Sequence, residues 1–77
     1  MKSLYTKRLD VLCTLLAEAR AEAGLTQREL ATLLCKSRSY VGKIEVGERR
    51  LDVVEFISMC EEIGVDPAKI LKEIQKV

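Results

Sequence analysis

Arg38, Ser39 and Lys43 are the residues of this 77-residue chain whose side chains and spacing best suit recognition of a base. Arginine presents a planar fork that matches the O6 and N7 atoms of guanine, serine hydrogen-bonds to either kind of base edge, and lysine reaches guanine or phosphate. All three fall in one short predicted helix at about 38–45, on its outer face. A two-turn helix that follows another short helix after a tight turn fits the major groove of DNA.

The composition argues against catalysis and against metal binding. The chain has no histidine, and Cys13, Cys35 and Cys60 lie far apart without a C-x-x-C pair. A structural zinc site therefore lacks ligands, and Ser-His or Cys-His catalysis is impossible within one chain. The sequence also has no phosphate-cradling glycine loop and no cluster of carboxylates. We expect no enzymatic activity, no catalytic residue, no metal and no cofactor.

Length and cysteine usage indicate one small domain in a reducing compartment. A chain of 77 residues forms a single domain with a small core, which leaves little room for a deep substrate cavity. The odd number of cysteines argues against a disulfide framework. The sequence has no apolar run long enough to span a membrane, and its first residues lack a signal-peptide core. We expect a cytoplasmic protein with no membrane partner, in which residues 1–77 form one domain.

The basic residues are concentrated in one segment, although the whole chain has a net charge of only +1. Residues 36–50 contain five basic and two acidic residues, a net charge of +3, whereas residues 51–77 contain three basic and six acidic residues, a net charge of −3. A basic surface is therefore expected on the third helix and the loop after it. Such a surface suits phosphate contacts, which supply sequence-independent DNA affinity, and a merely solvated charged face is the alternative.

Apolar spacing predicts two helices before the one that carries Arg38. Apolar residues at three- and four-residue steps give a first helix at roughly 4–23, which Gly24 ends. Thr26 and Glu29 form a capping box that opens a second helix of about two turns. The inward face of this second helix is formed by Leu30, Ala31 and Leu34.

A third and a fourth helix follow. Ser37 is the candidate N-cap of the third helix. Asp52 and Glu55 form another capping pair, which opens a fourth helix that Gly64 ends. The inward positions predicted for these two helices are Val41 and Ile44, then Val53, Phe56, Ile57, Cys60 and Ile63.

A fifth helix is predicted at about 67–76, because Asp66 is a suitable N-cap and Pro67 suits the first helical position. Its apolar side carries Ile70, Leu71, Ile74 and Val77. Together the predicted elements make an all-α fold, a compact five-helix bundle in one domain.

Three stretches of the sequence fall in the register of a known motif: Gly24-Leu25-Thr26-Gln27-Arg28-Glu29-Leu30-Ala31, Ser37-Arg38-Ser39-Tyr40-Val41 and Ile44-Glu45-x-Gly47-Glu48-Arg49. They resemble the phage-repressor (Cro/CI, also called XRE) helix-turn-helix family, from about residue 9 to residue 66. The resemblance implies a lambda-repressor-like domain with its helix-turn-helix at about 26–46. It also implies a transcriptional regulator, here expected to be a repressor, that reads double-stranded DNA and commonly binds a palindromic operator as a homodimer.

Carried over by position, the resemblance assigns roles on DNA. Arg38 and Ser39 match the main base-reading positions of the family, and Lys43 matches the reader one turn later. For each of the three, a phosphate or solvent contact is the alternative. Phosphate contacts or support are expected from Gln27, Ser37, Tyr40, Gly42, Arg49 and Arg50.

Three of these positions have more than one interpretation. Tyr40 either lays its ring toward the DNA backbone or a thymine methyl, or packs against the second helix. Gly42 reflects a close approach to the DNA backbone or simple tolerance of glycine. Cys35 stands where the family usually has a glycine with positive φ. Either it adopts a left-handed conformation at a cost of about 1 kcal/mol, or the turn takes another shape.

Arg20 and Glu45 are charged residues at positions predicted to face inward. Arg20 lies on the apolar face of the first helix, and Glu45 follows Ile44 on the inner side of the third. A lone buried charge is costly, so each needs a partner. The two resemble the family's buried arginine–glutamate pair, and we expect a bidentate bridge between them.

Two questions about partners stay open at this stage. One small module makes few base contacts, so a homodimer on two half-sites about 34 Å apart is expected. Its candidate surface is the fifth helix with the end of the fourth. The apolar side of the fifth helix alternatively closes the core of the monomer. The competing function is a protein-interaction module of antitoxin or co-regulator type that keeps the fold without reading DNA sequence.

Overall fold

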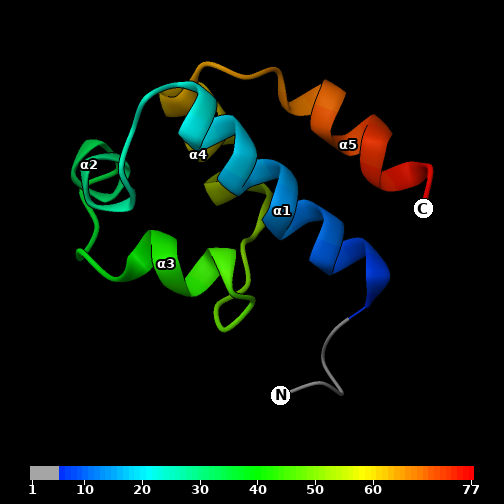
Figure 1. The fold of residues 1–77 in the computed structure, drawn as a ribbon, viewed down its shortest axis with the longest axis horizontal. Coiled ribbons are helices and arrows are strands. Elements are labelled where there is room, and N and C mark those ends of the chain that lie inside the picture. The colour runs from blue at the N-terminus through cyan, green and yellow to red at the C-terminus, as the bar shows by residue number, and fades with distance from the viewer. Residues whose placement is uncertain (1–5) are drawn as a thin grey trace.

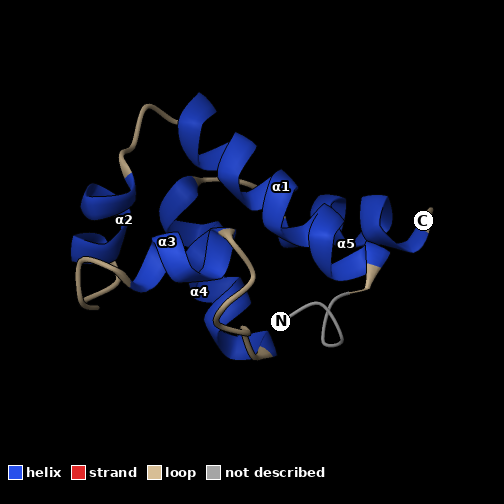
Figure 2. Ribbon diagram, turned by 60° about the horizontal axis from the view of Figure 1, so that its bottom comes forward, coloured by secondary structure: helices blue, strands red, loops and turns tan. Residues whose placement is uncertain are grey.

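Five helices and no strand make up residues 6–77, the part of the chain that the computed structural model describes (Figure 1). The longest helix, at residues 7–22, contacts the third, fourth and fifth helices and passes between the third and the fifth (Figures 1 and 2). The all-α fold predicted from the sequence is confirmed. In chain order the helices are α1 (Lys7–Glu22), α2 (Gln27–Leu33), α3 (Tyr40–Glu45), α4 (Val53–Ile63) and α5 (Pro67–Gln75).

The start of α1 is fixed by Thr6, whose side-chain oxygen accepts a hydrogen bond from the backbone N–H of Leu9 at 3.1 Å. Thr6 has extended φ and ψ angles, so the helix begins at Lys7. The expected start at about residue 4 lies outside the described residues. At the other end, Gly24 has a φ of 78°, which favours glycine and ends the helix as predicted.

The boundaries of α2 and α4 are set by the two capping boxes that the sequence contains. Glu29 N–H donates to the Thr26 hydroxyl at 3.0 Å, and Thr26 N–H donates to the Glu29 carboxylate at 2.9 Å. Asp52 and Glu55 make the same reciprocal pair at the start of α4. Each box satisfies two backbone donors that the first turn leaves free, so both predicted starts are confirmed.

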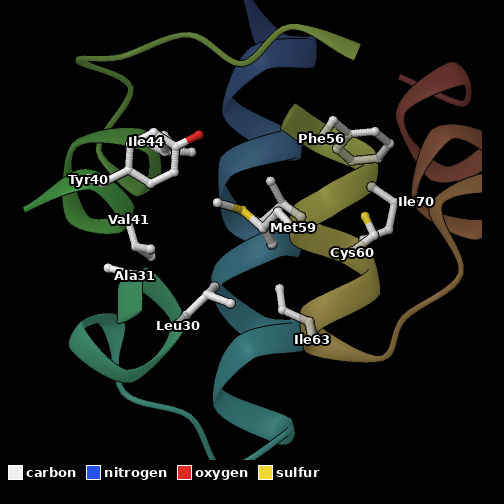
Figure 3. Close-up of a cluster of buried hydrophobic side chains, with 11 residues drawn as sticks. Leu30, Ala31, Tyr40, Val41, Ile44, Phe56, Met59, Cys60, Ile63 and Ile70 are labelled. Carbon is white, nitrogen blue, oxygen red and sulfur yellow. The ribbon is translucent and has the colours of Figure 1, made fainter. Parts of the chain in front are cut away.

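The core is one apolar cluster to which every helix contributes (Figure 3). Burial raises the pKa of the Cys60 thiol to about 11, so this side chain packs as a neutral, apolar group at physiological pH. The larger side chains that are less than 2% exposed are Leu16, Leu30, Val41, Met59 and Cys60.

The inward face of α4 differs from the prediction at three positions. Val53 is 71% exposed and Ile57 is 41% exposed, so neither belongs to the core. Met59, which was not predicted, is 1% exposed and lies among the buried side chains in Figure 3. The observed face of Phe56, Met59, Cys60 and Ile63 has the i, i+3, i+4, i+7 spacing of a helix packed along one line.

Candidate nucleic-acid interface

The helix-turn-helix is anchored to the core by the inner faces of α2 and α3. Leu30 and Ala31 of α2 and Val41 and Ile44 of α3 are each at most 2% exposed. The Cys13 thiol of α1 also donates a hydrogen bond to the Ile44 carbonyl at 3.2 Å. Since both helices are short, these contacts rather than intrinsic helix propensity hold them in place.

Cys35 closes α2 in the left-handed conformation, with a φ of 59°. Its N–H donates to the Thr32 carbonyl at 3.0 Å, and the N–H of Lys36 donates to the Ala31 carbonyl at 2.9 Å. These are the two hydrogen bonds of a Schellman motif, which normally places glycine at this position. Of the two turn shapes considered for Cys35, the structure has the left-handed one.

Replacing Cys35 with glycine is expected to stabilise the fold by about 1 kcal/mol, because it removes the left-handed penalty. For a domain of this size, that gain raises the melting temperature by about 4–8 °C. Thermal unfolding followed by circular dichroism measures the effect. The matched control is Cys35→Ala, which removes the thiol but keeps the Cβ atom and so keeps the penalty. Equal melting temperatures for the two variants would show that the turn stores no strain.

The third helix begins later than the predicted range of 38–45. It starts at Tyr40, with Ser39 at the N-cap position and no side-chain capping bond. Ser37, the predicted cap, instead accepts a hydrogen bond from Tyr40 N–H through its backbone carbonyl at 3.0 Å. The capping role assigned to Ser37 is therefore wrong, because a turn at residues 38 and 39 separates it from the helix.

The three residues predicted to read bases are all exposed. Arg38 and Ser39 lie in the turn that leads into α3, and Lys43 lies within the helix. The N–H of Lys43 donates to the Ser39 carbonyl at 3.1 Å, which places these two residues one helical turn apart. The structure thus presents the arginine, the serine and the lysine to solvent at the start and middle of one two-turn segment.

Behind this segment, Glu45 joins three elements through hydrogen bonds. Arg20 of α1 donates to it from Nε to Oε2 at 2.7 Å and from Nη2 to Oε1 at 3.1 Å. Gln27 of α2 donates from Nε2 to the same Oε1 at 2.8 Å, and Arg20 Nη1 donates to the Leu25 carbonyl at 2.7 Å. Hydrogen bonding to Glu45 raises the pKa of Arg20 above its ordinary value. The side chains of Arg20 and Glu45 are 16% and 8% exposed, so the bidentate pair is largely shielded from water.

Gly42 lies against the side chain of Gln27. A Cβ atom at position 42 would meet Gln27 Oε1 at 3.1 Å, tighter than an ordinary van der Waals contact. The close neighbour that the structure gives this glycine is therefore the amide of α2. Gln27 is held between Glu45 and Gly42, and it fixes the spacing of α2 and α3 at the end nearest the solvent.

Tyr40 is only 7% exposed, and its ring belongs to the core cluster (Figure 3). Lys36 Nζ lies 5.4 Å and Arg49 Cζ lies 4.7 Å from the ring centre. Burial, and then the negative charge of Glu55, raise the pKa of the Tyr40 hydroxyl. Of the two roles considered for Tyr40, the structure shows packing, and the ring is covered rather than presented to a ligand.

Arg49 and Arg50 have different environments, although both were predicted to contact phosphate. The Arg49 guanidinium donates to both carboxylate oxygens of Glu55, at 3.4 and 3.1 Å, and to the Arg50 carbonyl at 2.9 Å. Because it also stacks over Tyr40, its contacts lie within the chain. Arg50 is exposed. Arg49 therefore positions the loop after α3, but its side chain is 40% exposed and its phosphate contact stays a prediction.

The carboxylate of Glu55 links this loop to the pH of the solution. Hydrogen bonds from Arg49, and then from the Asp52 backbone, lower the pKa of Glu55 below its ordinary value. In the unfolded chain the pKa of Glu55 returns to its ordinary value. The contact with Arg49 therefore stabilises the fold at a pH above that ordinary pKa, and this stabilisation is lost as the pH falls through the lowered pKa of the folded chain.

We expect the melting temperature of Glu55→Gln to depend less on pH, between about 5 and 3, than that of the parent chain. The variant should also melt at a lower temperature at pH 7, because a neutral amide binds Arg49 more weakly. A pH series of thermal melts measures both effects. Glu61→Gln, an exposed change elsewhere on α4, is the control and should keep the parental slope. If the melting temperatures of Glu55→Gln and the parent changed equally with pH, Glu55 would not contribute to the loss of stability in acid.

Comparisons with known proteins place this arrangement in a family. A family model described as helix-turn-helix matches residues 16–70, which include α2, the turn and α3. An XRE-family like protein from Pseudomonas syringae pv. tomato is similar in structure, with a TM-score of 0.87 and 45% sequence identity over 97% of this chain and 92% of that chain. This chain belongs to the XRE-type helix-turn-helix family. The family is one of DNA-binding regulators.

Two further solved structures are similar to this XRE-type chain. The clp gene regulator ClgR from Corynebacterium glutamicum has a TM-score of 0.81 and 28% identity, over 92% of this chain and 76% of that one. The restriction-modification controller protein C.AhdI from Aeromonas hydrophila has a TM-score of 0.73 and 32% identity, over 80% of this chain and 94% of that one. A comparison with curated proteins finds no significant match.

Lys36 of this XRE-type chain is a candidate contact residue that the sequence pattern alone does not single out. Lys36 is exposed in the turn before α3, and its ammonium lies over the Tyr40 ring. The available signal was its place among the five basic residues of 36–50, close to Arg38 and Ser39. Within residues 6–77, no cluster of metal-ligating side chains and no helix capable of crossing a membrane is found.

The four candidate dimer residues, three in α5 and Val77 just after it, divide into two groups. Ile70 is 5% exposed and Ile74 is half-buried, so both contribute to the monomer's own core. Leu71 is 50% exposed and Val77 is 44% exposed. The prediction left open whether this stripe closes the core or remains available to a second copy, and the structure divides it between the two.

Proposed function

We propose that this XRE-type chain is a sequence-specific regulator of transcription, a repressor, whose residues 1–77 act as one DNA-binding domain. The single observation that carries the proposal is the exposed set of Arg38, Ser39 and Lys43 on a segment whose opposite face is buried. A short helix fixed in this way can enter the major groove without rearranging its own core.

The chemistry of each side chain supports a different contact in the major groove. Arg38 offers a bidentate fork to a guanine, Ser39 bonds to either kind of base edge, and Lys43 reaches guanine or phosphate one turn further along. Lys36, Ser37 and Arg50, which are exposed around the segment, supply contacts to the DNA backbone. These backbone contacts set the register of α3 on the duplex but carry no sequence information.

Gln27 supports the interface from α2. One amide hydrogen of Gln27 is donated to Glu45, which braces the first turn of α2 against α3, and the second remains for a phosphate of the DNA. The Arg20–Glu45 pair extends this brace to α1. We infer that these residues act on affinity by fixing the angle at which α3 enters the groove.

We further propose that the regulator binds a palindromic operator as a homodimer. A single module of this size buries little surface on DNA, and two half-sites about 34 Å apart double the interface. Leu71 of α5 and Val77, which follows that helix, are exposed and favour a contact near the chain's C-terminal helix. Exposed Val53 and Val54 at the start of α4 enlarge the apolar surface that is available. Occupancy of the operator then represses transcription from it.

Selection of bound sequences from a random pool of duplex DNA tests the proposal. We expect an enriched motif with two inverted half-sites, and an affinity that falls steeply as salt concentration rises. Light scattering at micromolar protein concentration tests the dimer separately. An enriched single half-site with monomeric protein would contradict the dimer alone. No enrichment, together with salt-independent or absent DNA binding, would contradict DNA reading and favour the protein-interaction module.

A further inference from the structure

A shallow groove lies between the second half of α1 and α5, away from the reading segment. Its volume is about 180 Å³, and a neighbouring hollow of about 230 Å³ shares Ala19, Glu22 and Val65 with it. The floor of the groove is apolar, because it is formed by Leu15, Ala19, Val65 and Ile70. The two hollows together continue along α1 from Leu15 to Ala23.

The rim of this groove is acidic. Glu18 and Glu22 of α1 and Glu73 of α5 line it, and Lys69 is the one basic lining residue. Within residues 6–77, neither Glu18 nor Glu22 forms a salt bridge. Glu73 pairs with Lys76 at 2.9 Å, but both side chains are more than half exposed, so this pair is weak and exchangeable. The rim therefore presents carboxylates that are available to cations of another molecule.

We propose that this groove binds a short amphipathic helix of a partner protein, with apolar side chains on the floor and lysine or arginine along both flanks. Leu15 of α1 and its C-cap residue Ala23 are eight positions apart, so the groove is about 12 Å long, or two helical turns. Three apolar anchors at i, i+4 and i+8 on the partner helix span about 12 Å and so match that length. The acidic rim selects a basic helix over an acidic one.

The distribution of charge makes the two binding surfaces independent. Residues 36–50, which include Arg38, Ser39 and Lys43, have a net charge of +3, whereas the charged residues that line the groove, three glutamates and Lys69, have a net charge of −2. In both ribbon views α1 separates α3 from α5 (Figures 1 and 2). A basic helix is therefore repelled from the DNA-reading surface and attracted to the groove, and it does not need to displace DNA.

Fluorescence anisotropy with two labelled synthetic helices tests the proposal. One peptide carries leucine at i, i+4 and i+8 with lysines on both flanks, and the other carries glutamates in place of the lysines. With the whole chain at about 0.15 M salt, where screening limits charge effects to about 8 Å, the lysine peptide should bind at least tenfold more tightly than the glutamate peptide. Equal affinities, or no binding of the lysine peptide at millimolar protein, would overturn the proposal.

Two charge-reversed chains locate the binding site. Glu18→Lys with Glu22→Lys changes the rim and should weaken the lysine peptide about tenfold. Glu61→Lys with Glu62→Lys makes the same change in net charge on the exposed side of α4 and should alter its affinity less than about twofold. Amide shifts on binding should map to residues 15–23 and 65–73. Shifts centred on α3, or equal losses in the two variants, would overturn the proposal, and neither result depends on whether the chain binds DNA.

Discussion

Replacing Arg38 with glutamate is expected to lower affinity for the selected DNA site by about a hundredfold. The change removes a bidentate contact to a guanine and places a negative charge in the groove beside the phosphates. Arg38 is exposed and precedes the first turn of α3, so the fold should be retained. Anisotropy titration of a labelled duplex measures the affinity, and circular dichroism checks the helix content.

The control for this change is Lys72→Glu, which reverses a charge on an exposed residue of α5. It alters the net charge equally and should reduce affinity only slightly. A milder variant, Arg38→Ala, distinguishes base reading from phosphate binding. If Arg38 reads a base, selection with Arg38→Ala should relax preference at one position in each half-site. A uniform loss across all sequences would assign Arg38 to the backbone instead.

Arg20→Ala is expected to destabilise the fold by about 3 kcal/mol, because it leaves a shielded carboxylate without its cation. For a domain of this size the melting temperature should fall by about 12–24 °C. Glu45 would keep the hydrogen bond from Gln27, but the two bonds from Arg20 and the bond to the Leu25 carbonyl would be lost. Thermal or urea unfolding measures the loss.

Two further variants test whether the loss of stability in Arg20→Ala comes from the ion pair with Glu45. Arg28→Ala removes an exposed arginine of α2 and should change the melting temperature little. Adding Glu45→Gln to the Arg20→Ala variant should recover part of the loss, because it removes the unpaired charge. An unchanged melting temperature for Arg20→Ala would show that the pair contributes nothing to stability.

The parts of the fold that could be predicted are those that local chemistry decides. Thr26 and Glu29 satisfy each other's backbone donors wherever the helix lies in the molecule, and the same holds for Asp52 and Glu55. The inward face of α4 was less predictable because Val53 and Ile57 fit the helical spacing as well as Met59 does. Which of the possible faces is buried depends on where α1, α2 and α5 pack, and this is not encoded within the helix itself.

The candidate site shows the same division. The exposure of Arg38, Ser39 and Lys43 could be predicted because Val41 and Ile44 define the apolar face of the third helix and the polar residues fall outside it. The position of Tyr40 could not, since its burial depends on Lys36, Arg49 and the start of α4 approaching its ring. Arg49 is one of two adjacent arginines that look equivalent in sequence. Only the position of Glu55 in the fold shows that Arg49 is the one that pairs with this carboxylate.

The shortness of α2 and α3 has a consequence for how the protein loses activity. With seven and six residues, neither helix would persist outside the molecule, because a segment of that length cannot repay the cost of helix nucleation. A proteolytic fragment confined to residues 26–46 would therefore be a random coil. Cleavage or thermal melting of the scaffold should abolish recognition in a single cooperative step and leave no partly active species.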